Sequence, residues 1–122
     1  MKQTMEALKA FFSSFGLPAY LSGNIPDNVK MPYITYDLVE PEPLSTATMN
    51  ASVWYRSTGT TEVALKADEI KAAIGNGRDI QTESGVIHLF RDNGVPFCQI
   101  MNDPDRETKR GLLSLRIHCN TQ

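Results

Sequence analysis

The stretch from Met49 to Ile74, MNASVWYRSTGTTEVALKADEIKAAI, places a strand with alternating side chains directly before an amphipathic helix. Its helical part has four apolar residues at intervals of four, three and four, which puts them on one side of a helix: Val63, Ala67, Ile70 and Ile74. The opposite side is charged and carries Glu62, Lys66 and Glu69. This pattern predicts a helix that packs on one face of a sheet.

Capping residues bound this predicted helix on both sides. Thr60 or Thr61 can cap its start with a hydroxyl that accepts an early backbone N–H. Gly75 and Gly77 follow its last apolar residue and permit the positive φ with which many helices end. We therefore expect the helix to run from about residue 60 to residue 74.

The composition indicates one globular domain over residues 1–122. The chain is 41% hydrophobic, and its net charge of -2 comes from 14 acidic and 12 basic residues. Because the basic residues form no block, sequence-specific nucleic-acid binding is not expected. Cys98 and Cys119 lack the spacing of a zinc site or a disulfide framework, and this favours reduced thiols. The first 15 residues lack a continuous apolar run, so we expect neither a signal peptide nor a membrane span.

Glycine and proline residues divide the rest of the chain into further elements. Apolar residues recur at helical spacing from Gln3 to Phe15, with Met5, Leu8, Phe12 and Phe15 on the predicted buried side. Alternation or β-rich composition predicts strands at 32–39, 45–56, 80–82, 86–91, 96–101 and 109–119. A loop at about residues 40–45, which contains Pro41 and Pro43, is expected to project from the sheet. The order predicts an α+β fold: a mixed, mainly antiparallel sheet with both helices on one face.

The strand at 45–56 is long, and its two faces differ in character. Ala47, Met49, Ala51, Val53 and Tyr55 alternate with polar residues and with Trp54 and Arg56. We therefore expect Trp54 and Arg56 to face away from the helices.

No motif in the sequence predicts catalysis, a cofactor site or a metal site. His88 and His118 lie in separate strands without a nucleophile or carboxylate at catalytic spacing. The cluster Asp103-Pro104-Asp105 with Glu107 lacks the glycine of a calcium loop and is typical of a solvated turn. The glycines at 57–60 and 75–78 lack the spacing of a phosphate-binding loop. These observations favour a protein that is not an enzyme.

Taken in order, several segments resemble the tail terminator, or tail completion, proteins of long-tailed bacteriophages. They are PYITYDLV, the strand ending in VWYRS, the helix EVALKADEIKAAI, and the terminal segments VIHLFRDNG, PFCQIMNDPD and TKRGLLSLRIHC. The resemblance covers residues 3–120 and depends on the joint order of these segments. The same order of elements occurs in neck and tail-tube proteins of such phages.

The resemblance implies a structural role in a virion tail. Proteins of this family form a ring, commonly a hexamer, that caps the head-proximal end of the tail tube and joins it to the head connector. The implied partners are other copies of the chain, the major tail tube protein and the connector proteins, with DNA passing through the ring. Synthesis in the cytoplasm of the host bacterium is also implied, and no membrane is involved.

Exposed polar and aromatic residues are the candidates for protein contacts. They lie in the projecting loop, on the outer face of the long strand and in the acidic turn: Glu40, Glu42, Trp54, Arg56, Asp103, Asp105 and Arg106. Two alternatives stay open: a head–tail adaptor or other minor virion protein, and an α+β enzyme that binds a small molecule.

Overall fold

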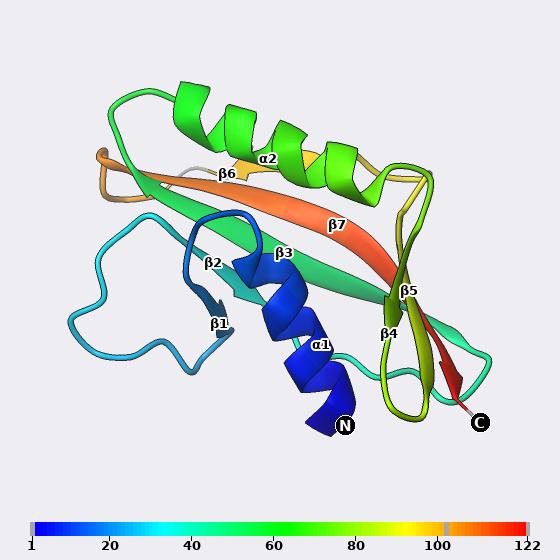
Figure 1. The fold of residues 1–122 in the computed structure, drawn as a ribbon. Coiled ribbons are helices and arrows are strands. Elements are labelled where there is room, and N and C mark those ends of the chain that lie inside the picture. Colours follow the sequence, from blue (N-terminus) through cyan, green and yellow to red (C-terminus); the bar gives the residue numbers. More distant parts are fainter. Residues whose placement is uncertain (1, 102, 122) are drawn as a thin grey trace.

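The computed structural model describes residues 2–101 and 103–121 and contains two helices and a seven-stranded sheet (Figure 1). The elements in chain order are α1 (Lys2–Ser13), β1 (Ala19–Leu21), β2 (Tyr33–Tyr36), β3 (Thr46–Arg56), α2 (Thr61–Ile74), β4 (Arg78–Gln81), β5 (Gly85–Arg91), β6 (Cys98–Met101) and β7 (Thr108–Thr121). The predicted α+β class is confirmed. Strand β1 was not predicted, because three residues are too few to show an alternating pattern.

Strand β7 organises the sheet, whose order is β1-β2-β3-β7-β5-β4 with β6 also paired to β7. Along one edge, β7 pairs with the whole of β3. Along its other edge it pairs with β6 near its start and with β5 near its end. Among the strands of the described residues, only β1 and β2 are parallel neighbours, so the sheet is mixed and mainly antiparallel, as expected.

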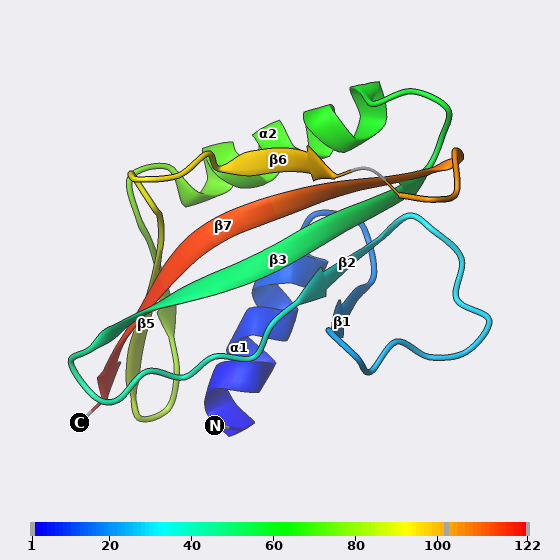
Figure 2. The same ribbon diagram turned by 180° about the vertical axis from the view of Figure 1, so that it is seen from behind.

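Both helices lie on the same face of the sheet, which we call the inner face (Figure 1). Viewed from behind, the strands lie in front of both helices, so the opposite, outer face is not covered by a helix of the described residues (Figure 2). The core fills the space between the helices and the inner face. It includes the predicted α2 residues Val63, Ala67, Ile70 and Ile74. From α1, Phe12 stacks on Tyr36 of β2 with their ring centroids 5.2 Å apart.

Two details of the helices differ from the sequence-based expectation. The buried side of α1 consists of Thr4, Leu8, Phe11 and Phe12, whereas Met5 and Phe15 are only partly buried. The side of α1 that faces the sheet is therefore rotated relative to the prediction. Thr60 is the N-cap of α2, but its side chain makes no capping hydrogen bond. At the other end Gly75 has the expected positive φ of 56°.

Helix α2 packs closely on the sheet over Gly111 of β7. A methyl group at Gly111 would lie 3.1 Å from Cγ2 of Val63 and 3.2 Å from Sγ of Cys98. A glycine at this position therefore allows the close packing of α2 on the sheet. Within the described residues, neither helix is long and apolar enough to cross a lipid bilayer.

Candidate interaction surface

Trp54 lies on the outer face of the sheet, where its neighbours hold the indole in place. Val53 beside it in β3 is fully buried on the inner face, so the alternation of the strand turns Trp54 outward. The indole Nε1 donates a hydrogen bond to Oγ1 of Thr35 at 2.9 Å. The guanidinium of Arg110, opposite Trp54 in β7, lies 4.7 Å from the ring centroid, within the range of a cation–π contact. Trp54 is consequently half-buried and fixed.

This part of the outer face is covered by its own side chains. Thr35 and Ser52 are only 5% and 3% exposed, although no helix lies over them. Ser52 accepts a hydrogen bond from Nε of Arg110 at 3.0 Å. The rings of Tyr20, Tyr33 and Trp54 form a continuous series with centroid separations of 6.0 and 6.3 Å. The result is an aromatic and basic surface patch over β1, β2, β3 and β7, which we call the Trp54 patch.

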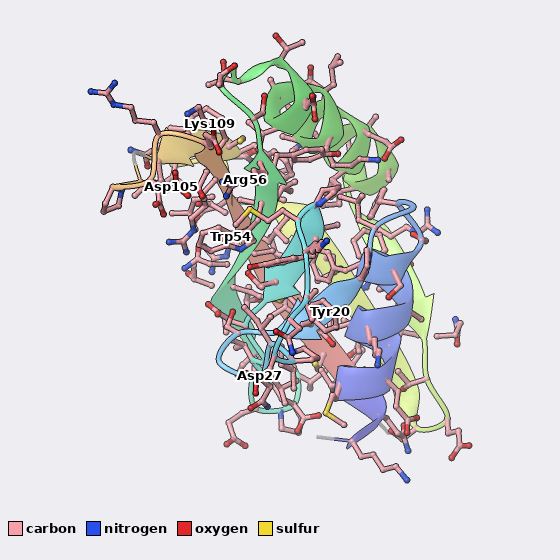
Figure 3. The ribbon with its side chains drawn as sticks, turned by 90° about the vertical axis from the view of Figure 1, so that its left-hand side faces the viewer. Tyr20, Asp27, Trp54, Arg56, Asp105 and Lys109 are labelled. Atoms are coloured by element: carbon pink, nitrogen blue, oxygen red, sulfur yellow. The ribbon has the colours of Figure 1, made fainter. Side chains whose placement is uncertain are left out.

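Arg56 and Asp105 meet at one end of the sheet, where Figure 3 shows them close together. Arg56 forms ion pairs with Asp105 at 3.4 Å and with Glu107 at 2.5 Å. Asp105 also accepts hydrogen bonds from the amide of Glu107 at 3.0 Å and from Oγ1 of Thr108 at 3.0 Å. The pKa of Asp105 lies below its usual value, mainly because its carboxylate accepts the hydrogen bond from the Glu107 amide. The hydrogen bond from Thr108 and the charge of Arg56 lower this pKa further. The pair therefore fixes the turn before β7 to the end of β3.

The other candidates in this turn differ in how strongly they are held. Asp103 accepts a hydrogen bond from the amide of Asp105 at 2.9 Å, which is the pattern of an Asx turn. Arg106 is exposed at the tip, and its carbonyl accepts a hydrogen bond from Nζ of Lys109. The predicted solvated turn is thus present, and it presents charges of both signs.

The loop between β2 and β3 leads to the other end of β3, and hydrogen bonds fasten it to the sheet and to α1. Oγ1 of Thr4 donates to the carboxylate of Glu40 at 2.6 Å, and this bond lowers the pKa of Glu40. The amide of Leu44 donates to the carbonyl of Cys119 at 3.0 Å. The side chains of Glu42 and Leu44 are exposed, Leu44 to 71%.

The structure thus separates the seven candidates into two groups. Arg56, Asp103, Asp105 and Arg106 come together, with Trp54 two residues from Arg56 on the same strand. Glu40 and Glu42 lie in the loop that leaves β2 opposite Ala51 and returns to the start of β3 at Thr46, toward the other end of that strand.

The side chains that surround Trp54 were not predicted from the sequence. Tyr20, Tyr33 and Arg110 join it only because β1, β2 and β7 are neighbours of β3, and no local pattern in the sequence reveals that pairing. A second group on the outer face includes His88 and His118, whose ring centroids are 6.1 Å apart. His118 is 3.0 Å from Oγ1 of Thr46, and His88 pairs with Asp79.

The chemical capacity of the described residues is modest. Burial raises the pKa values of the Cys98 and Cys119 thiols, which makes both poor nucleophiles at neutral pH. Residues 2–101 and 103–121 contain no cluster of three or more His, Cys, Asp or Glu side chains that could hold a metal ion. An open cavity of 660 Å³ lies between the start of α1 and the β4–β5 turn, lined mainly by polar side chains such as Gln3, Glu6 and Thr82.

Comparison with solved structures shows that this fold occurs in a virus-like particle. The chain is similar to one in a structure described as the virion of a native gene transfer agent particle, with a TM-score of 0.66 and 15% identity. The similarity covers 97% of this chain and 90% of that chain. No protein-family model and no curated protein matches the sequence. At this identity the similarity establishes the shared fold.

Proposed function

We propose that this chain is a structural protein of a phage-like virion and that it acts as a tail terminator. In this role, copies of the chain form a ring on the head-proximal end of the tail tube, stop its polymerisation and join it to the head connector. The observation that carries the proposal is the fold similarity to a virion chain, which extends over nearly the full length of both chains. The resemblance of the sequence segments to tail terminator proteins supports the same role.

The positions of the candidate contact residues suit a ring that caps a tube. Such a ring has two neighbours, the tube on one side and the connector on the other, and therefore needs two separate surfaces. The Arg56–Asp105 pair and the loop with Glu40 and Glu42 lie toward opposite ends of β3. We assign one end to each neighbour, with Trp54 between them as the largest aromatic side chain of the candidate set.

The aromatic and charged composition of these surfaces fits contact with proteins. Interfaces are enriched in Trp, Tyr and Arg, and a few such residues carry most of the binding energy. The Trp54 patch contains all three residue types in one half-buried group. Internal hydrogen bonds already hold the side chains of the patch in place. These side chains would therefore lose little conformational entropy when a partner binds.

A tube-length assay tests the terminator role. Tube subunits from the phage that encodes the chain are polymerised with and without the purified chain, and tube lengths are measured by negative-stain electron microscopy. We expect the chain to bind one tube end and to shorten the length distribution. Uncapped tubes of unchanged length refute the terminator role. Binding to the connector without an effect on tube length would instead identify a head–tail adaptor.

A further inference from the structure

Four polar side chains form one row across the outer face of the sheet, with the two histidines of the chain at its centre. The register places Thr46 of β3 opposite His118 of β7. It also places His118 opposite His88 of β5, and His88 opposite Asp79 of β4. The residues on either side of each histidine in its strand are buried, so the alternation of the strands turns both imidazoles outward.

Each imidazole is held through its Nδ1 atom, on the side turned away from the other imidazole. Nδ1 of His118 lies 3.0 Å from Oγ1 of Thr46, and β3 flanks β7 on the side opposite to β5. Nδ1 of His88 pairs with the carboxylate of Asp79, and β4 flanks β5 on the side opposite to β7. In an imidazole ring Nε2 belongs to the edge opposite Nδ1. The Nε2 edges of the two histidines therefore face the space between them.

Both Nε2 atoms are available to a ligand. Within residues 2–101 and 103–121, neither Nε2 takes part in a hydrogen bond or an ion pair. The two ring centroids are 6.1 Å apart, and 39% of the His88 side chain is exposed. A carboxylate at Nδ1 accepts a proton from that nitrogen, which leaves the lone pair of Nε2 free in a neutral imidazole. The Thr46 hydroxyl can accept the Nδ1 proton of His118 in the same way.

Two imidazole nitrogens that face one space suit a divalent transition-metal ion. Imidazole is a common ligand of Zn²⁺, Cu²⁺ and Ni²⁺. Tetrahedral Zn²⁺ lies about 2.0–2.1 Å from each nitrogen, so it needs the two Nε2 atoms about 3.3 Å apart. Exposed side chains move on a timescale of picoseconds to nanoseconds, so rings with centroids at 6.1 Å can close to this spacing by small rotations.

The groups around the two rings match the surroundings of metal-binding histidines. Such histidines usually donate the other ring N–H to an oxygen, often that of a carboxylate, which fixes the tautomer and the orientation of the ring. Asp79 takes this position at His88, and Thr46 takes it at His118. Arg116 follows on the same face of β7 and opposes a bound cation, but the negative charge of Asp79 offsets it.

We propose that His88 and His118 chelate one divalent transition-metal ion, such as Zn²⁺, through their Nε2 atoms. Asp79 and Thr46 are positioning residues that hold the two rings. Water completes the coordination, because no third His, Cys, Asp or Glu of the described residues forms a cluster with the pair. The bound ion joins β5 to β7 on the outer face. This site goes beyond the proposed function and requires neither a ring nor a tail tube.

Zinc titration of the intact, ¹⁵N-labelled chain at neutral pH tests the site. Calorimetry should give one Zn²⁺ per chain, and long-range ¹H–¹⁵N NMR should show a change in the Nε2 chemical shift of both histidines. His88→Gln and His118→Gln each leave a single ligand. Each should weaken zinc affinity by about tenfold or more, since loss of an orienting partner alone costs about 10–100-fold. Asp79→Asn keeps both ligands and should weaken the affinity by about tenfold.

Cys98→Ser is the matched control, because thiolates also bind zinc and Cys98 is only partly buried. This variant should bind zinc as tightly as the wild type. Absence of zinc binding by the wild type, a shift at only one histidine, or loss of binding in Cys98→Ser overturns the chelate. Unchanged affinity in Asp79→Asn overturns the positioning role of Asp79. Tube capping is measured separately, so failure of this site and failure of the terminator role are distinguishable.

Discussion

Replacement of Gly111 by alanine tests how tightly α2 is packed on the sheet. The added methyl group would lie 3.1 Å from Cγ2 of Val63 and 3.2 Å from Sγ of Cys98, closer than ordinary van der Waals contact. Val63 is a β-branched helical residue with one strongly preferred rotamer, so Cγ2 moves only if α2 moves. We therefore expect Gly111→Ala to force a small displacement of α2.

Two opposing effects set the size of this change. Overpacking a core by one methyl group costs about 1–3 kcal/mol. Loss of glycine flexibility in the unfolded chain stabilises the protein by about 0.4–1 kcal/mol. The difference is a net destabilisation of about 1 kcal/mol, which corresponds to a melting temperature lower by about 4 °C for a domain of this size.

A double-mutant cycle with Val63→Ala identifies the cause. Val63→Ala removes the Cγ2 atom and leaves space for the new methyl group at Gly111. Urea unfolding of the wild type, both single variants and the double variant gives the coupling energy. We expect the double variant to be more stable than the sum of the single effects predicts, by about 1 kcal/mol. If Gly111→Ala is as stable as the wild type, or if the two effects simply add, the close packing described above is wrong.

Three further changes address the core, the Trp54 patch and the acidic turn. Phe12→Ala removes the ring stacked on Tyr36 and should cost about 3–5 kcal/mol in urea unfolding, with a midpoint shift but little change in slope expected. Trp54→Ala should weaken ring assembly, measured by light scattering, more than it lowers the melting temperature of the monomer. The reverse order would mean that the Trp54 patch stabilises the fold and is not an interface. The pKa of Asp105 is lowered on folding, so its contribution to stability is present above its unfolded pKa of about 3.8 and is lost as the pH falls through the lower folded value. Carboxyl NMR should therefore give a pKa below 3.8, and Thr108→Val should raise it; an unchanged pKa would contradict the hydrogen-bonding account.

The sequence predicted those parts of the fold that local periodicity determines. The spacing of Val63, Ala67, Ile70 and Ile74 predicted α2 and its buried side, and all four residues are buried. Alternation also predicted β3 to within one residue at its start. In these segments one face of the element packs against the core, so the apolar residues recur at the helical or alternating spacing through most of the segment.

Features that depend on distant pairing could not be predicted in this way. The buried side of α1 includes Phe11, whose ring packs against Phe12 and lies under the guanidinium of Arg78 in the distant strand β4. Strand β1 exists only because it pairs with β2, since three residues carry no periodicity. Similarly, Arg110 joins Trp54 across a strand pair that brings together residues 56 positions apart.

The central position of β7 has a consequence for synthesis on the ribosome. The neighbours β3, β5 and β6 all precede β7 in the chain, so they emerge before the strand that joins them. Of the strand pairs in the described sheet, only β1–β2, β2–β3 and β4–β5 can form before β7 emerges, and β3 and β5 each keep an unpaired edge until then. We therefore expect stalled nascent chains that lack β7 to bind chaperones and to be sensitive to protease, with protection appearing in one step when the last strand is released.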